Sequence, residues 1–209
     1  MKMMEDVEDD EDVKAPEQSK DDKTSWKPTQ KLSSTFLKKW PGVLGSTKWR
    51  TPEYVVNLVG DKTLVEIKRT DKLFLELGCG DARVLINVAK RFPFLQCEGY
   101  EINTLVHKEA EERVKESGLD NVTVHLESAY RARVSDADVI YVYSNRRGLH
   151  QLHSLLCRLK PGARLILYQN DVKSPIPNAE RRRVRCQDPK NELVVWPVYV
   201  YTRKKDDIE

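Results

Sequence analysis

Between residues 73 and 201, short apolar runs alternate with longer amphipathic stretches. The apolar runs are typical of strands buried on both faces of a parallel sheet, and the amphipathic stretches of helices that pack on that sheet. The predicted strands are residues 73–77, 96–100, 122–126, 137–143 and 164–168. The predicted helices are residues 81–91, residues 103–117 with Gly118 as the stop, and about 149–159. This order predicts an α/β fold with helices on both faces of the sheet.

The pattern changes at both ends of this alternation. Two strand-like runs, residues 183–186 and 193–201, flank the turn Asp188-Pro-Lys-Asn191 and predict a C-terminal antiparallel hairpin. Before the first strand, Thr51 and Pro52 have the residue types of a helix N-cap and a first helical position. We therefore place the folded domain at residues 51–205.

Charge is distributed unevenly along the 209 residues. Residues 1–25 carry ten Asp/Glu and four Lys, a net charge of −6, and lack apolar periodicity, which predicts a disordered acidic tail. The remainder carries 32 Lys/Arg against 23 Asp/Glu, a net charge of +9. Such an excess either solvates the surface or attracts nucleic acid, anionic lipid or an acidic protein.

Between the tail and the domain, residues 26–50 are rich in Lys, Ser and Trp. Trp26, Trp40 and Trp49 are spaced irregularly, so the segment is predicted to be a partly ordered arm rather than a regular element. Its aromatic side chains either pack on the core or form a lid that contacts the substrate.

The sequence contains four cysteines without C-x-x-C spacing: Cys79, Cys97, Cys157 and Cys186. Three of them fall in apolar or glycine-turn patterns, which favours reduced thiols in a cytosol-like compartment. No apolar run reaches the length of a membrane span, and the N-terminus is too acidic for a secretory signal or a mitochondrial presequence. We expect an intracellular protein, cytoplasmic rather than mitochondrial or nuclear.

The stretch Leu73-Phe-Leu-Glu-Leu-Gly-Cys-Gly-Asp-Ala-Arg83 carries the strongest functional signal. It predicts a buried strand that enters a tight turn with two glycines, Gly78 and Gly80, where a ligand can approach the backbone closely. One acidic residue, Glu76, precedes the turn, and a second, Glu101, follows it by about twenty residues, at the end of the next strand. This layout indicates a nucleoside cofactor whose ribose is held by Glu101.

Two common nucleotide sites do not match this turn. A dinucleotide motif needs a third glycine where this chain has Arg83, and a P-loop needs a Gly-Lys-Ser/Thr that is missing here. A phosphate-free cofactor with an amino-acid end would instead need small residues, a carboxylate for its ammonium group and a carboxylate for its ribose. The glycine pair, Glu76 and Glu101 supply these residue types.

Three segments resemble the class I S-adenosylmethionine-dependent methyltransferases: Glu76-Leu-Gly-Cys-Gly-Asp-Ala82, Tyr100-Glu101 and Leu159-Lys-Pro-Gly-Ala-Arg-Leu-Ile166. The first of them, with Glu98-Gly-Tyr-Glu-Ile-Asn103, is most similar to the protein lysine methyltransferases related to the one that modifies the ATP synthase c subunit. That group has D-L-G-S-G-D-G-R followed by G-Y-E-L-N. This chain differs at Glu76, Cys79 and Ala82 and lacks the group's hydrophobic N-terminus.

The resemblance implies a Rossmann-like seven-stranded sheet whose last strand is inserted antiparallel. It also implies that S-adenosyl-L-methionine binds at Glu76, Gly78, Gly80 and Glu101, and that the chain is an enzyme that methylates a protein lysine. The alternatives are an RNA or small-molecule methyltransferase of the same fold, and a domain that binds a cofactor or a partner without catalysis.

Further candidate positions follow the third and fourth strands. The family commonly has an adenine-contacting residue after strand three, where this chain has Glu127 and Ser128. After strand four, Ser144 and Asn145 are candidates for positioning the substrate by their location alone. The Asn/Asp-Pro-Pro-Tyr motif of many amine methyltransferases is absent there, which argues against an adenine or glutamine-amide acceptor.

Two clusters of side chains are ambiguous. His150 and His153 share a helix face but lack nearby Cys or acidic ligands, so we predict surface or packing roles and no metal. The Arg181-Arg-Arg183 run with Arg185 is the densest basic cluster. It is either a solvated strand edge or a contact for an acidic peptide or RNA.

Overall fold

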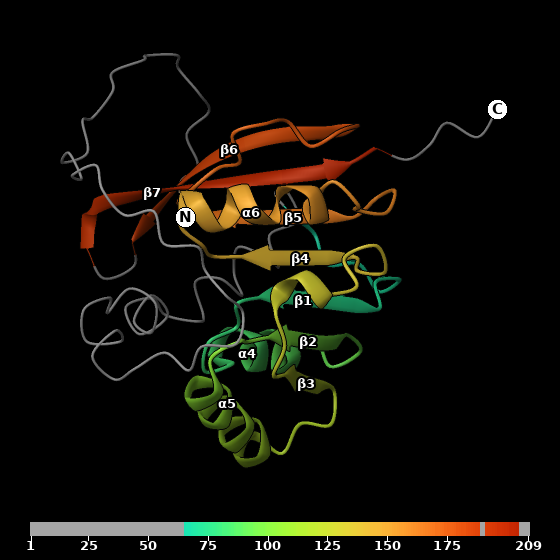
Figure 1. Ribbon diagram of the computed structural model, residues 1–209, viewed down its shortest axis with the longest axis vertical. Coiled ribbons are helices and arrows are strands. Elements are labelled where there is room, and N and C mark those ends of the chain that lie inside the picture. Colours follow the sequence, from blue (N-terminus) through green and yellow to red (C-terminus); the bar gives the residue numbers. More distant parts are fainter. Residues whose placement is uncertain (1–64, 189–190, 205–209) are drawn as a thin grey trace.

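The computed structural model of this chain describes residues 65–188 and 191–204. These residues form a seven-stranded sheet in the order β3-β2-β1-β4-β5-β7-β6 (Figure 1). The predicted acidic tail, the arm at residues 26–50 and the helix start at Thr51 lie outside the described residues.

Five parallel strands and a C-terminal hairpin make up the sheet. The strands are β1 Leu73–Leu77, β2 Gln96–Tyr100, β3 Val122–His125, β4 Val139–Val142, β5 Arg164–Tyr168, β6 Ala179–Asp188 and β7 Asn191–Arg203. β7 runs antiparallel to both of its neighbours, β5 and β6. The predicted α/β class, the seven-stranded sheet and the antiparallel hairpin are therefore confirmed.

The helices between the strands are α4 Arg83–Arg91, α5 Thr104–Ser117 and α6 Arg146–Leu156, and the short 3-10 helix η1 spans Ala129–Arg131. Asn103 caps α5 by accepting the Leu105 and Val106 N–H groups, and Gly118 ends it with a φ of 67°, as predicted. α4 begins two residues later than expected, because Ala82 has a left-handed φ of 60°.

Apolar side chains pack on both faces of the sheet. On one face, α4 and α5 contribute Val84, Leu85 and Ala110 to a core with Phe74 and Ile166. On the other, four leucines of α6 cover inward side chains of β1, β4 and β5. Figure 1 shows α6 in front of the strands. β1 is buried along its whole length, so the turn at its carboxyl end starts from the centre of the packed sheet.

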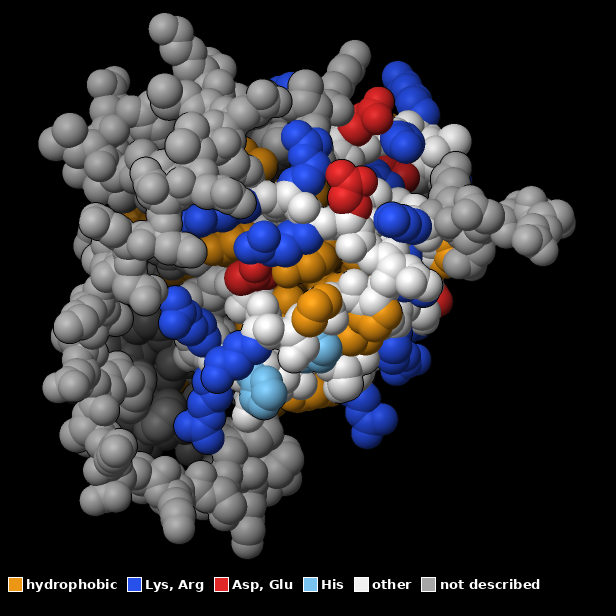
Figure 2. Space-filling view, turned by 90° about the horizontal axis from the view of Figure 1, so that it is seen from above, with side chains coloured by type: hydrophobic (Ala, Val, Ile, Leu, Met, Phe, Trp, Pro, Cys, Tyr) orange, Lys and Arg blue, Asp and Glu red, His pale blue; other side chains and the backbone are white. Residues whose placement is uncertain are grey.

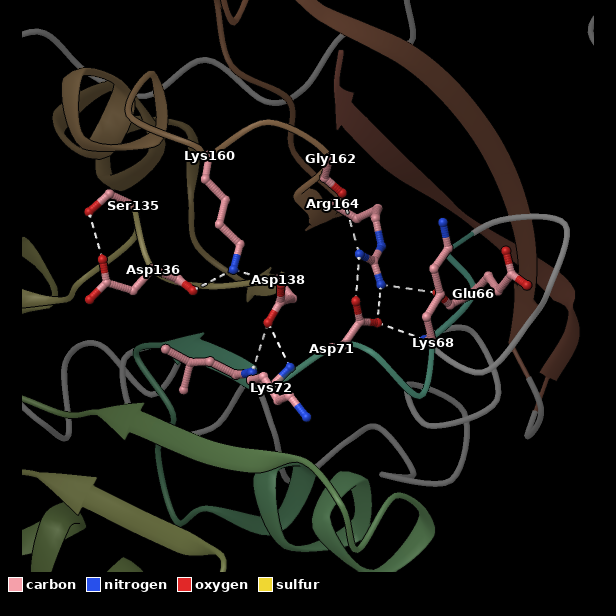
Figure 3. A network of polar contacts seen from close by, with 11 residues as sticks. Glu66, Lys68, Asp71, Lys72, Ser135, Asp136, Asp138, Lys160, Gly162 and Arg164 are labelled. Carbon is pink, nitrogen blue, oxygen red and sulfur yellow. Dashed lines mark hydrogen bonds and ion pairs between the residues drawn. The ribbon is translucent and has the colours of Figure 1, made fainter. Parts of the chain in front are cut away.

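A buried ion pair closes the amino end of the sheet (Figure 3). Arg164, at the start of β5, is 6% exposed and is paired with Asp71, just before β1. Its Nε and Nη2 also donate to the carbonyls of Val65 and Glu66, at 3.1 and 3.0 Å. The guanidinium therefore fixes the chain that enters β1 against the centre of the sheet.

Replacing Arg164 by alanine should lower the free energy of unfolding by about 3–5 kcal/mol, because Asp71 would be left buried without its counter-charge. Urea unfolding followed by circular dichroism measures the change. The matched control is Arg158→Ala, which removes an exposed guanidinium and should change stability by less than about 0.5 kcal/mol. Equal stability of the two variants would contradict this role.

Candidate active site

The glycine turn after β1 is tied to the end of β2. The N–H groups of Gly78 and Cys79 both donate to the Tyr100 carbonyl, at 2.9 and 3.1 Å. Gly78 and Gly80 have φ values of 77° and 58°, in the left-handed region that favours glycine. A Cβ added at Gly78 would meet no atom of residues 65–188 or 191–204 within 4 Å, so this part of the chain leaves the backbone of the turn open.

Glu101 holds the same turn from the other strand. One carboxylate oxygen accepts the Gly80 N–H at 3.1 Å, and the other accepts the Asn103 N–H at 2.8 Å. Each oxygen of an ionised carboxylate has room for a second donor, so the side chain can still bind the hydroxyl groups of a ribose. The structure thus brings Glu101 and Gly80 together, as the sequence suggested.

Gly99 is a residue of this site that the sequence analysis did not single out. A Cβ at this position of β2 would lie 2.7 Å from Cys79 Sγ, 2.8 Å from its Cβ and 3.0 Å from Leu85 Cδ2. Cys79 is fully buried, so it has no space into which it could retreat. Glycine is therefore required here by the close approach of the turn.

Glu76 is a buried acid with an unsatisfied oxygen. Its exposed fraction is 2%, and Oε2 has no hydrogen-bond partner among the described residues. Burial raises the pKa of Glu76 well above its ordinary value, and the nearby charges of Asp81 and Glu101 raise it further. A buried carboxyl with one unsatisfied oxygen is costly, and a cationic ligand would compensate it.

Asp81, in contrast, is already neutralised by the chain. It forms ion pairs with Arg83 and with Arg113 of α5. Burial opposes its ionisation, but the hydrogen bonds and charge of Arg83 together with Arg113 outweigh burial, and the pKa of Asp81 lies below its ordinary value. Arg83, in the position of the third dinucleotide glycine, therefore organises the turn.

The other predicted positions lie at the same edge of the sheet. Ser128 caps η1 by accepting the Tyr130 N–H, and its neighbour Glu127 is exposed. Asn145 caps α6 by accepting the Gly148 N–H at 2.8 Å. The Ser144 hydroxyl lies over the first turn of α6, 2.1 Å from where a Cβ on Gly148 would stand. Cofactor and substrate contacts of these four residues stay predictions.

The sequence analysis also missed a hydrogen-bonded pair next to Ser144, formed by Tyr143 and Gln169. The Tyr143 hydroxyl donates to Gln169 Oε1 at 2.9 Å, and so joins the ends of β4 and β5. The signal for Tyr143 was the alternation in Tyr141-Val-Tyr143, which places a second aromatic ring just beyond the strand. Nothing in the sequence indicated its partner Gln169, which directly follows β5.

The two ambiguous clusters have contacts of their own. His153 Nε2 lies 3.0 Å from the Ser174 carbonyl, and His150 is exposed. No group of three or more potential metal ligands occurs within residues 65–188 and 191–204. Arg181 pairs with Asp171 and lies over the Tyr199 ring, 5.0 Å from its centroid. Figure 2 views the molecule from the top of Figure 1, where β6 forms the edge of the sheet, and shows several Lys and Arg side chains on that side.

Two further observations bear on the expected thiols and membrane character. Cys79, Cys97 and Cys157 are free, and burial raises the pKa of each thiol. None of the helices in the described part of the chain combines the length and apolar character needed to cross a membrane.

Comparisons with known proteins agree with this geometry. Residues 76–179, about half of the chain, match the family model of the ANTKMT methyltransferase domain. A protein-lysine N-methyltransferase of Saccharolobus islandicus is 28% identical over 127 residues, which cover 59% of this chain and 76% of that protein.

Solved structures show the same fold. An RNA methyltransferase from Salinibacter ruber in complex with S-adenosyl-L-homocysteine is 27% identical, with a TM-score of 0.60, and the match covers 76% of this chain and 96% of that one. The magnesium protoporphyrin IX methyltransferase of Synechocystis is 16% identical, with a TM-score of 0.59, over 82% of this chain and 92% of that one.

The chain is a class I S-adenosylmethionine-dependent methyltransferase. Its cofactor is S-adenosyl-L-methionine, and the site fits that molecule on two grounds of its own. The unsatisfied Glu76 Oε2 suits a ligand with an α-ammonium group, and the open space beside Gly78 leaves the turn accessible.

Replacing Glu76 by glutamine should raise the stability of the ligand-free methyltransferase at pH 7, because the amide has no charge to desolvate. The folded-state pKa of Glu76 is above its unfolded value, so the folded chain retains a proton that the unfolded chain releases, and stability falls as pH rises. The advantage of the variant should therefore be small near pH 4 and grow towards neutrality.

Thermal unfolding over a pH series measures this difference. Glu112→Gln, which changes an exposed glutamate of α5, is the matched control and should show no such trend. A Glu76→Gln variant that is less stable than the wild type at pH 7 would contradict the cost assigned to burying the Glu76 carboxylate.

Proposed function

We propose that this methyltransferase methylates the side-chain amine of a protein lysine. The proposal is carried by the sequence match to the protein-lysine N-methyltransferase of Saccharolobus islandicus. The match to the ANTKMT domain family begins at Glu76, before the glycine turn, and extends past β5.

In this proposal the cofactor lies across the turn. Glu76 faces its ammonium group, the backbone at Gly78 and Gly80 supports its amino-acid end, Glu101 binds its ribose, and Glu127 or Ser128 contacts its adenine. When bound, S-adenosyl-L-methionine supplies a methyl group on a cationic sulfur to an amine that attacks in line.

The chain has to bring the lysine amine to that position in its neutral form. Burial of the amine at the carboxyl edge of the sheet, next to a positive charge, lowers its pKa, because both effects disfavour the ammonium form. Transfer then depends on alignment and on exclusion of water.

A second candidate is methylation of RNA. It is supported by the likeness to the Salinibacter ruber enzyme and by the charge of residues 139–204, which carry 13 Lys/Arg against four Asp/Glu. RNA binding of this kind would weaken steeply as salt concentration rises.

Replacing Glu101 by alanine should weaken S-adenosylhomocysteine binding by about 10- to 100-fold, because charge-assisted hydrogen bonds to the cofactor and to Gly80 are both lost. Isothermal titration calorimetry measures the affinity, with Glu112→Ala on an exposed position of α5 as control. Undiminished affinity in Glu101→Ala would exclude the ribose contact.

The acceptor is tested by labelling cell extract with tritiated S-adenosylmethionine and the purified enzyme, before and after treatment with ribonuclease or protease. We expect a labelled protein band that survives ribonuclease and disappears with protease. Label that is lost only to ribonuclease would replace the lysine proposal by the RNA alternative. Omission of the enzyme controls for methyltransferases of the extract.

A further inference from the structure

The start of α6 carries two exposed arginines, Arg146 and Arg147. Residues 139–170 contain five Lys/Arg and no Asp or Glu. Within residues 65–188 and 191–204, neither of the two guanidinium groups forms an ion pair, whereas Arg113, Arg133 and Arg181 each pair with a carboxylate. Both side chains can therefore bind an anionic ligand.

The position of these arginines is unfavourable for the helix itself. The N-terminus is the positive end of the helix macrodipole and favours acidic side chains. The first turn of α6 has no acidic residue, and Arg146 and Arg147 carry like charges there. Asn145 already caps the helix by accepting the Gly148 N–H at 2.8 Å, so the arginines are not needed as caps. A local rule broken without a gain in stability is expected at a functional position.

The first turn of α6 is fixed at the carboxyl edge of the sheet. Val142 pairs with Leu77, the residue before the glycine turn, so α6 begins at the edge that holds the cofactor turn. Asn170, beyond β5, donates its Nδ2 hydrogen to the Ser144 carbonyl at 3.1 Å and ties down the loop before α6. Figure 1 shows β4 leading directly into the start of α6. In the proposed reaction, the arginines thus lie at the edge where the acceptor approaches.

Two further side chains enlarge this surface. His150 is exposed one turn after Arg146, on the same face of α6. The short helix η1 packs against α6, and its residue Arg131 is exposed. Figure 2 shows Lys and Arg side chains beside a histidine side chain (pale blue). We refer to Arg131, Arg146, Arg147 and His150 as the α6 patch.

We propose that the α6 patch docks acidic side chains that flank the acceptor lysine, and so selects lysines in acidic segments of a protein. This rests on the proposed lysine acceptor. A guanidinium group is a planar fork that binds a carboxylate through two parallel hydrogen bonds, and complementary charge adds specificity and a faster encounter. RNA phosphates and the acidic residues 1–25 of this chain carry the same charge, and binding measurements distinguish them.

Peptide binding tests the α6 patch. Two fluorescent peptides, with one lysine between pairs of aspartates or between pairs of asparagines, are titrated at low salt with the full chain in complex with S-adenosylhomocysteine. Fluorescence anisotropy gives the affinities. The wild type should prefer the aspartate peptide. Arg146→Gln combined with Arg147→Gln should weaken this peptide by about 10-fold, the loss of two exposed ion pairs, and leave the asparagine peptide unchanged.

A matched control and two further readouts exclude a general effect of charge or stability. Arg91→Gln combined with Arg158→Gln changes the net charge equally at exposed positions near the ends of α4 and α6, and should bind like the wild type. The Arg146 and Arg147 double variant should keep or raise the melting temperature, because its lost charges oppose the helix dipole. Its labelling of protein should be slower in dilute extract and approach the wild-type rate in concentrated extract, since docking acts on acceptor binding.

The outcomes separate the possible occupants of the α6 patch. Equal affinity of the wild type and the double variant for the aspartate peptide, or no preference of the wild type for it, would overturn the inference. A loss of affinity only for a single-stranded RNA oligonucleotide would assign the patch to phosphates. Aspartate-peptide binding that requires removal of residues 1–25 would assign it to that segment. If the wild type labels only RNA, the lysine proposal fails, and the peptide affinities still decide whether the patch binds carboxylates.

Discussion

The close crossing of the glycine turn over the end of β2 is the constraint on which the site depends. Two N–H groups of the turn share the Tyr100 carbonyl, and a third binds the Glu101 carboxylate. The crossing is only possible because Gly99 leaves room for the buried Cys79 side chain. These backbone contacts between the turn and the end of β2 fix the shape of the turn and the position of Glu101 together.

This arrangement brings three carboxyl groups together, and the protein does not provide partners for all of their oxygens within the described residues. Asp81 has two arginine partners, and Glu101 has two backbone N–H donors. Glu76 retains an oxygen without a partner in the described part of the chain, in a position where burial already opposes its charge. Burial of this carboxyl therefore lowers the stability of the ligand-free protein. A cationic cofactor that binds only the folded state would raise that stability again.

Much of the scaffold could be predicted, because buried parallel strands have a distinctive apolar pattern. β1, β2 and β5 begin and end where the sequence placed them. β6 was predicted too short, since an edge strand with the run Arg181-Arg-Arg183 lacks alternating hydrophobicity. In the site, the residue types around the turn could be predicted from the chemistry of the ligand. The fit of Gly99 against Cys79 and the positive φ of Gln169 could not, because both arise from contacts between distant segments.

The two halves of the sheet differ in net charge and in how far their strands extend at the carboxyl edge. Residues 65–138, which include β1 to β3 and the cofactor turn, carry 11 Lys/Arg against 14 Asp/Glu, whereas residues 139–204 carry 13 against four. β5 ends at Tyr168, opposite Val198, so the part of β7 at residues 191–197 extends about 20 Å beyond it at the carboxyl edge (Figure 1). In the proposed reaction an acceptor that approaches across β4 to β7 meets the half of the sheet with the net positive charge, while the cofactor lies on the acidic half. In the proposed reaction this polarity favours an acidic acceptor at the end of β4 and β5, where Tyr143 and Gln169 lie, and places the two ligands on separate sides of one edge.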